Sequence, residues 1–160
     1  EAVILGCTEI ALLVGDATER QAFQAELQAR IAGLGLQDRV RLVGHATDMP
    51  AALMLADVVV HASTDAEAFG RTVIEAQAMA RPVIASDLGA PRETVAEGIT
   101  GWRTPPGDAA ALAAALSRAL AMTDSERAAL GARARAAVLS GYTTAAMQAA
   151  TMATYRELLG

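Results

Sequence analysis

The sequence of 160 residues contains no lysine, and all 13 of its basic residues are arginine. A P-loop nucleotide site needs a lysine after its last glycine, so the chain holds no site of that kind. A pyridoxal-phosphate Schiff base also needs a lysine amine, and its chemistry is excluded within the chain for the same reason. The Gly-x-Gly-x-x-Gly motif of dinucleotide-binding dehydrogenases does not occur either.

Aromatic residues and positive charge are scarce as well. Phe, Tyr and Trp make up 3% of the chain, so a stacking platform for nucleic-acid bases is not expected. The net charge of -5 argues further against a polyanionic partner, because phosphate backbones are bound by basic surfaces. We therefore expect no nucleic-acid partner, and any phosphate site must be local.

The chain has one cysteine and no long hydrophobic run. Cys7 cannot form an internal disulfide, which fits a reducing compartment, and we expect it to be a small buried apolar residue. Charged residues interrupt every apolar stretch, so no transmembrane segment is predicted. No signal peptide is visible at the start of the chain. These features favour a cytoplasmic protein.

The residues that are present suffice for one hydrophobic core. Hydrophobic residues make up 53% of the chain and charged residues 19%, which favours a single domain over residues 1–160. Strand-like and helical runs alternate along the sequence, and this alternation predicts an α/β sheet with helices on its faces. The predicted strands are Ile10–Val14, Val40–Val43, Val58–Ala62 and Val83–Ala85.

The helices are predicted from their capping residues and apolar periodicity. The first runs from Thr18, in a capping box with Gln21, to about Ala32, the second from a cap at Asp48 to about Ala56, and the third through Thr72 and Glu75. The fourth covers Ala109–Met122 after Asp108, and the fifth covers Asp124–Leu139 after a Thr123–Glu126 capping box. The last runs to Leu158 after a break at Gly141-Tyr142-Thr143. Ligands of such sheets bind at the carboxyl ends of the strands, which here are Gly15-Asp16, Gly44-His45, Ser63 to Glu67 and Asp87 to Ala90.

The segment Glu67-Ala-Phe-Gly-Arg-Thr-Val-Ile-Glu75 places two carboxylates around a Phe-Gly turn, where an apolar strand gives way to a helix. A helix N-terminus has unsatisfied N–H groups and a positive dipole end, so Phe69 to Thr72 is expected to present donors to an anion or to sugar hydroxyls. Gly70 lets a ligand approach the backbone. Glu75, one turn further on, can accept hydrogen bonds from a vicinal diol.

Each of these residues also has a simpler interpretation. Glu67 could be an exposed loop acid, and Glu75 could pair with Arg71, four residues before it. The Arg71 side chain could equally contact phosphate or be solvated. Asp48 is foremost an N-cap. For the remaining polar or large residues near the strand ends we expect structural roles: hydrogen bonding for His45 and His61, turns for Asp16 and Asp87, and a core or interface anchor for Trp102.

The Glu67-x7-Glu75 spacing, the Phe-Gly between the two acids and the following Glu75-Ala-Gln-Ala-Met-Ala-Arg-Pro-Val-Ile-Ala-Ser-Asp87 resemble the signature of retaining GT-B glycosyltransferases of family 4, the glycosyl transferases group 1. The resemblance extends over almost the whole chain, through Leu12–Asp16, Arg39–His45, Gly89–Glu93 and Gly98–Asp108. It implies a Rossmann-like parallel sheet with helices on both faces, the C-terminal half of a GT-B fold.

The resemblance also implies an activity. Family members transfer a hexosyl group from a nucleotide-diphosphate sugar to a glycan or lipid-linked acceptor with retention of configuration, and no cofactor is expected. The implied roles are catalysis for Glu67, donor binding for Phe69, Gly70, Arg71, Thr72 and Glu75, and contact with the nucleotide base for Gly15, Ala46 and Asp48. The likeness to bacterial enzymes that build lipopolysaccharide or other surface glycans implies work at the inner face of the cytoplasmic membrane.

The chain departs from the family in what it contains. GT-B enzymes have two domains, and this sequence resembles only the second, with a first strand and a Gly-Arg…Lys-Gly element expected before Glu1. Glu1–Gly6 is interpreted as the tail of the helix after that element, with a remnant of the first strand as the alternative, which leaves the sheet order open. Residues 142–160 are expected to pack toward the absent domain.

Without lysine, the chain alone is expected to bind a donor and not to transfer its sugar. Two other functions remain open at this point. One is an isolated, non-catalytic module that binds nucleotide sugars or another partner, and the other is a nucleotide-sugar epimerase of GT-B architecture.

Overall fold

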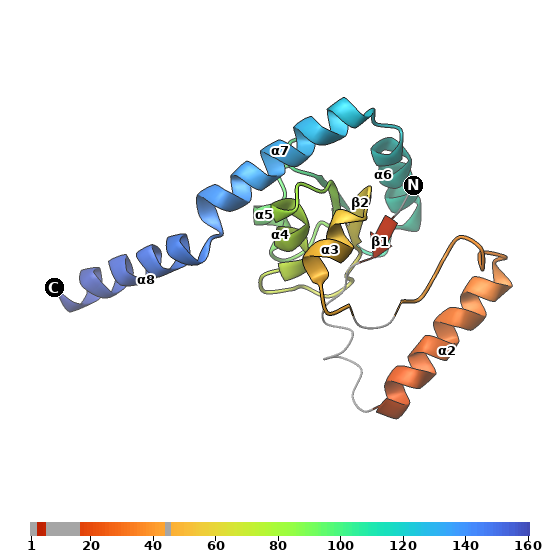
Figure 1. Cartoon of the computed structure of the whole chain (residues 1–160). Helices are drawn as coiled ribbons and strands as arrows, with labels where there is room; N and C mark the ends of the chain where they lie inside the picture. The colour runs from red at the N-terminus through yellow and green to blue at the C-terminus, as the bar shows by residue number, and fades with distance from the viewer. Residues whose placement is uncertain (1–2, 6–16, 44–45) are drawn as a thin grey trace. The chain divides into compact units, whose positions relative to one another are not determined.

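The computed structural model describes residues 3–5, 17–43 and 46–160 (Figure 1). These residues fall into two packing units. The larger unit includes residues 3–5 and 50–160 and contains the sheet, and the smaller includes 17–43 and 46–49 and contains the long helix α2 (Ala17–Gly33).

The larger unit is built on a four-stranded parallel sheet with the order β1-β2-β3-β4. Its strands are β1 (Val3–Leu5), β2 (Val58–His61), β3 (Val83–Ser86) and β4 (Trp102–Thr104). His61 lies opposite Ala85, and Ala85 lies opposite Arg103. Every residue of β2 and β3 is buried, as parallel strands covered on both faces require. The predicted strands at Val58 and Val83 are therefore confirmed.

Strand β1 corrects one expectation. Residues 1–6 were predicted to be the tail of a helix, but Val3–Leu5 form a strand that pairs in parallel with Val58–Val60. A short run of β-branched and apolar residues suits a strand, and pairing with β2 satisfies its backbone groups. The alternative interpretation as a strand is the correct one for these residues, and the order of the described strands is now known.

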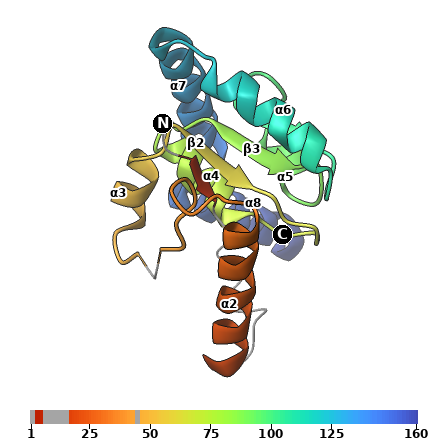
Figure 2. The same ribbon diagram turned by 90° about the vertical axis from the view of Figure 1, so that its right-hand side faces the viewer.

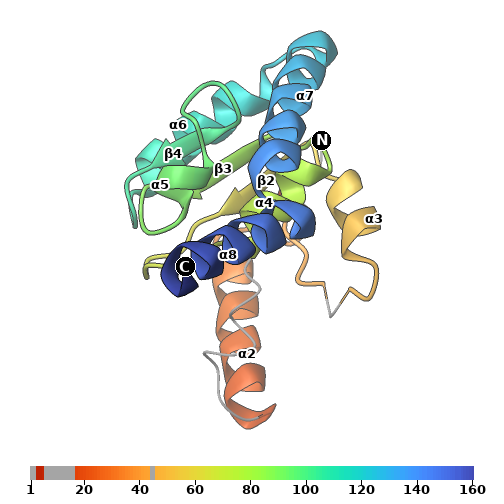
Figure 3. The same ribbon diagram turned by 90° about the vertical axis from the view of Figure 1, so that its left-hand side faces the viewer.

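Helices cover both faces of the sheet (Figures 2 and 3). Helix α6 (Ala109–Leu120) lies on one face, α4 (Arg71–Ala78) lies on the other, and α7 (Asp124–Gly141) packs along α4. Successive side chains of a strand point to opposite faces. Val58 and Val60 therefore pack in the cluster with α6, while Val59 and His61 face α4.

The hydrophobic core fills the space between the sheet and α6. It contains Val58, Val60, Ile84, Trp102, Ala115, Ala119 and Leu130. Burying a valine- or leucine-sized side chain contributes about 1.5–3 kcal/mol. The small alanines let α6 lie close to the strands, and Trp102 fills the end of the cluster with the Arg118 guanidinium 5.0 Å from its ring centroid. Trp102 is thus the core anchor that the sequence predicted.

Gly131 of α7 packs against the turn that follows α4. A Cβ at this position would overlap the carbonyl oxygen of Ala80, so only glycine fits the contact. Ala80 has a φ of 54° and is the one non-glycine residue with positive φ in the described ranges. Its left-handed backbone turns the chain from α4 toward Pro82 and β3. The close packing of α7 thus depends on two small residues.

The helix ends match most of the predicted caps. Asp108 Oδ1 accepts from the Ala111 amide at 2.9 Å, and the Thr123–Glu126 capping box is formed. Helix α3 (Met49–Met54) begins directly after Asp48 and ends two residues before the predicted Ala56. Two further helices complete the unit, the short α5 (Pro91–Thr94), which was not predicted, and the long α8 (Thr144–Leu159).

Two predictions in the smaller unit are wrong. Helix α2 begins at Ala17, so Thr18 lies inside its first turn and cannot be its N-cap. Residues 40–43 have no regular structure, and Val43 is 81% exposed. A strand needs a neighbour for its backbone groups, and the described part of this unit offers none. The strand predicted at Ile10–Val14 lies outside the described residues.

Helix α8 follows the predicted break at residues 141–143. The Thr143 hydroxyl caps it by accepting from the Ala146 amide at 3.1 Å. None of its residues is buried, and its large apolar side chains are exposed. In the ranges that the structure describes, no helix combines the length and the apolarity needed to cross a bilayer.

Candidate functional site

The candidate site lies where two loops meet at the carboxyl ends of β2 and β3. After His61 the chain runs through residues 62–70 into α4, and after Ser86 it runs through residues 87–90 into α5. The Ala90 amide donates to the Glu67 carbonyl at 3.1 Å. The loops therefore pack backbone against backbone, and the strand ends converge as the sequence predicted.

Glu67 is buried at the centre of this junction. The residue is only 7% exposed, so its interpretation as an exposed loop acid is wrong. Its Oε1 lies 2.7 Å from Nε2 of His61. A carboxylate removed from water needs a charged or hydrogen-bonding partner, and the last residue of β2 supplies it.

His61 is 2% exposed and has the hydrogen-bonding role that was expected for it. Its other ring nitrogen, Nδ1, is buried and has no hydrogen-bond partner among the described residues. A neutral imidazole carries one N–H group. A proton on Nδ1 would be a buried donor without an acceptor, so the proton belongs on Nε2, where it is donated to Glu67.

Gly70 caps the N-terminus of α4 in a left-handed conformation, with φ 65° and ψ 54°. Among the described residues, no side chain forms a cap hydrogen bond to this helix. A Cβ on Gly70 would lie 3.7 Å from Oε2 of Glu67, so the second carboxylate oxygen faces the start of the helix. The backbone N–H groups of the first turn and the Glu67 carboxylate are therefore neighbours.

The residues around Gly70 differ in exposure. Thr72 is buried, whereas Phe69 is exposed and its ring makes an edge contact with Tyr142 at a centroid distance of 6.2 Å. The side chain of Thr72 thus belongs to the packing of α4. Phe69 forms part of the surface next to the helix start.

Glu75 is partly accessible and forms the predicted pair with Arg71. Nη2 of Arg71 lies 2.9 Å from Oε1 of Glu75, and the two side chains are 76% and 32% exposed. An exposed pair at this spacing contributes only about 0.3–0.5 kcal/mol. A ligand with better hydrogen bonds can therefore displace Arg71 at little cost.

The three residues predicted to contact the nucleotide base do not belong to the described part of the larger unit. Ala46 and Asp48 belong to the smaller unit, and Gly15 lies outside the described residues, as do Asp16 and His45. Asp87 holds the end of β3 in place, because its Oδ1 lies 3.3 Å from Arg103 Nη1 and 3.5 Å from Arg92 Nε. That arrangement agrees with the structural role expected for Asp87.

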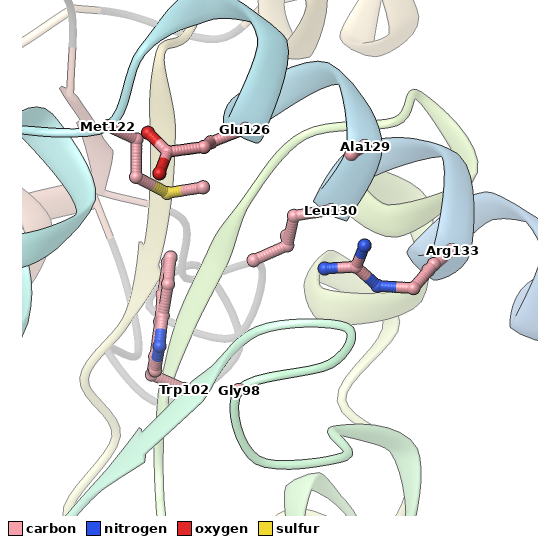
Figure 4. Close-up of a pocket in the computed structure, with 7 residues that line it drawn as sticks. All are labelled: Gly98, Trp102, Met122, Glu126, Ala129, Leu130 and Arg133. Atoms are coloured by element: carbon pink, nitrogen blue, oxygen red, sulfur yellow. The ribbon is translucent and has the colours of Figure 1, made fainter.

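Two surface hollows lie away from Glu67. One has a volume of about 270 Å³ and lies at the amino end of β4 (Figure 4). It is lined by Gly98, Trp102, Met122, Glu126, Ala129, Leu130 and Arg133. The other, of about 400 Å³, lies between β4 and α6. Neither is lined by a predicted site residue. The described residues also contain no cluster of three His, Cys, Asp or Glu that could hold a metal.

The pairing of His61 with Glu67 was missed in the sequence, although both residues had been placed near the ligand edge. The available signal was the position of His61. A histidine that ends a strand of valines is itself buried, and a buried imidazole requires a polar partner. Two acids follow His61 in the loop, Asp65 and then Glu67. Glu67, six residues after His61, is the one that folds back to it.

The sequence matches the family described as "Glycosyl transferases group 1" over residues 8–122. A phosphatidyl-myo-inositol mannosyltransferase from Mycobacterium leprae is 41% identical over 93 residues, which are 57% of this chain and 25% of that protein. The lipopolysaccharide core biosynthesis mannosyltransferase LpsB from Rhizobium meliloti is 42% identical over 89 residues, 55% of this chain and 25% of that protein. The chain thus spans about a quarter of the length of these relatives.

Solved structures show the same fold. The structure of Anabaena Alr3699/HepE in complex with UDP has a TM-score of 0.77 and 31% identity, and the match covers 84% of this chain and 37% of that one. A glycosyltransferase from Rickettsia africae has a TM-score of 0.86 and 26% identity, covering 99% of this chain and 48% of that one. The predicted Rossmann-like fold is confirmed, and by its sequence match the chain belongs to the glycosyl transferases group 1.

Proposed function

We propose that this chain is the nucleotide-sugar-binding part of a glycosyltransferase. The observation that carries the proposal is the junction of Glu67 with the N-terminus of α4. A buried carboxylate faces a helix start that has no side-chain cap. The site thus offers an anionic acceptor for sugar hydroxyls beside amide donors for phosphate oxygens.

Donor binding follows from the order of residues along α4. The diphosphate lies at the backbone N–H groups of Gly70 to Thr72, where the helix dipole favours negative charge. Glu75, one turn along, accepts two hydrogen bonds from the ribose diol. The ribose displaces the Arg71 guanidinium from Glu75, which frees Arg71 to contact phosphate.

Transfer requires stabilisation of charge that develops as the glycosidic bond breaks. Negative charge grows on the leaving diphosphate, and N–H groups fixed by the helix stabilise it more than the ground state. Glu67 accepts hydrogen bonds from the sugar and orients its anomeric carbon. We propose a hexosyl donor and retention of configuration, as the family resemblance implies, and no cofactor enters this scheme.

The relatives support the substrate classes. Anabaena Alr3699/HepE has been solved with UDP and with UDP-glucose, which supports a nucleotide-diphosphate sugar as donor. The relatives include a phosphatidyl-myo-inositol mannosyltransferase and a lipopolysaccharide core biosynthesis mannosyltransferase. We therefore propose a glycan or lipid-linked acceptor, with the reaction at the cytoplasmic face of a membrane.

The acceptor would be bound by a further domain. Helix α8 supports this part of the proposal, because all of its residues lie outside the core and it exposes large apolar side chains. These are Met147, Met152, Tyr155, Leu158 and Leu159. We propose that residues 142–160 pack against the acceptor-binding domain, which would cover this surface.

The test is a transfer assay on the full-length gene product, with UDP, GDP and ADP sugars and with lipid and glycan acceptors. We expect Glu75→Ala mainly to weaken donor binding and Glu67→Ala mainly to lower kcat. Donor binding without transfer to any acceptor would favour the binding-module alternative. Transfer at the parent rate by both variants would contradict the proposed site.

A further inference from the structure

The buried pair of His61 and Glu67 carries an inference that rests on the proposed function and extends it. We propose that His61 is a positioning residue for Glu67. It occupies Oε1 through its Nε2–H group and leaves Oε2 as the single carboxylate oxygen that a donor sugar can reach. Glu67 would then accept at one oxygen only and could not bridge two hydroxyls with both.

The geometry of the carboxylate is the first support. Oε1 lies 2.7 Å from Nε2 of His61, while the position of a Cβ on Gly70 is 3.7 Å from Oε2. The two oxygens therefore face different surroundings, one the end of β2 and the other the N-terminus of α4.

The protonation of the pair is the second support. Nδ1 of His61 is buried without a partner among the described residues, so a proton there would be an unsatisfied donor. The favoured tautomer therefore carries its proton on Nε2, which donates it to Oε1 of Glu67.

The backbone of Glu67 is held in place, so the hydrogen bond from His61 acts on the conformation of the Glu67 side chain. Its carbonyl accepts from the Ala90 amide at 3.1 Å, and Gly89 packs directly against it. With the backbone held, a glutamate still has three side-chain torsions. The bond from His61, itself fixed in β2, restricts them and preorganises the carboxylate.

The first experiment examines the pair without relying on catalysis. The chain has two histidines, so its imidazole NMR spectrum contains two sets of signals, and His45→Gln assigns them. We expect the His61 signals to show the proton on Nε2. Glu67→Gln should shift the His61 signals, whereas Glu75→Gln, which alters the exposed acid of α4, should not. A spectrum in which Glu67→Gln leaves His61 unchanged would overturn the assignment.

The second experiment separates positioning from a structural role. In the full-length gene product, His61→Leu removes the N–H donor and His61→Gln keeps one at similar reach. We expect the Leu variant to lose about 10- to 100-fold in kcat with a much smaller change in the donor KM, and the Gln variant to recover most of the loss. Thermal unfolding of both variants shows how much folded protein each assay contains.

Equal kcat values for the Leu and Gln variants, per folded protein, would overturn the positioning role. So would a loss confined to thermal stability, because a merely structural histidine would leave kcat unchanged. If the parent protein transfers no sugar, the proposed function is wrong. The imidazole spectra would still decide whether His61 holds Glu67.

Discussion

Gly89 packs directly against the backbone of Glu67. A Cβ at Gly89 would lie 2.6 Å from the carbonyl oxygen and 2.9 Å from the amide nitrogen of Glu67, which is closer than real Cβ atoms come. The loop after β3 therefore sets the position of the loop after β2. Any side chain at Gly89 must move Glu67.

This contact predicts a difference between two glycine substitutions. Gly89→Ala and Gly107→Ala both place a Cβ on a residue with positive φ, which costs about 1–2 kcal/mol. Only Gly89→Ala also meets backbone, adding about 1–3 kcal/mol. Urea unfolding should therefore show the larger loss for Gly89→Ala, together with weaker donor binding. Equal losses of stability in the two variants would mean that the loop containing Glu67 can move to accommodate the Cβ.

The contact between α7 and α4 predicts a similar difference. Gly131→Ala would drive a Cβ into the Ala80 carbonyl, whereas Gly141→Ala, in the same helix, has no atom within 4 Å. Alanine favours helices over glycine by about 1 kcal/mol, so Gly141→Ala should be neutral or stabilising. We expect Gly131→Ala to destabilise strongly despite its higher helix propensity. Thermal unfolding of both variants provides the measurement, and a stabilised Gly131→Ala would show that the helices can move apart.

Ala80 offers a stabilising substitution. Its φ of 54° is strained for alanine by about 1–2 kcal/mol, and glycine adopts it freely. Part of that gain is offset because glycine loses more backbone entropy on folding, by about 0.5–1 kcal/mol. Ala80→Gly should therefore raise the free energy of unfolding by up to about 1 kcal/mol, while the control Ala78→Gly inside α4 should lower it by a similar amount. Destabilisation by both substitutions would contradict the assigned strain.

The capping box of α7 predicts a pH dependence. Hydrogen bonds from the amide and hydroxyl of Thr123 lower the pKa of Glu126 below its ordinary value of 4.5. The folded state then binds the proton less readily than the unfolded state. The stabilisation is fully present above pH 4.5 and is lost as the pH falls through the lowered pKa.

Unfolding of the parent and of Glu126→Gln, followed from neutral to acidic pH, checks this effect. The parent should be the more stable at neutral pH, and the difference should shrink as the pH falls below 4.5. If the difference in stability between the two proteins is the same at every pH, the charge of Glu126 does not contribute to the stabilisation by the capping box.

Much of the larger unit was predictable because local rules and tertiary structure agree there. The valine run of β2 can only be a buried strand, and Thr123 with Glu126 can satisfy two backbone donors of α7 wherever that helix packs. The Glu67–Glu75 segment was predictable for a similar reason. A Phe-Gly turn between a strand and a helix places both acids near one helix start.

The failures come from information that is not local. Val40–Val43 has the composition of a strand, but a strand forms only where another backbone pairs with it. Val3–Leu5 was assigned to a helix for the opposite reason, because its pairing with β2 joins residues more than 50 positions apart. The bond between His61 and Glu67 depends on how the loop folds back over the strand end. Spacing alone does not encode that path.

We propose that a nucleotide sugar binds at the start of α4 beside Glu67. The most direct test is an amide NMR titration of this chain with UDP, GDP and ADP sugars, repeated with Glu75→Ala. We expect one class of donor to shift the amides of Gly70, Arg71 and Thr72 in a saturable way, and Glu75→Ala to weaken the binding. Saturable binding that leaves these amides unchanged, or binding of equal strength in Glu75→Ala, would contradict it.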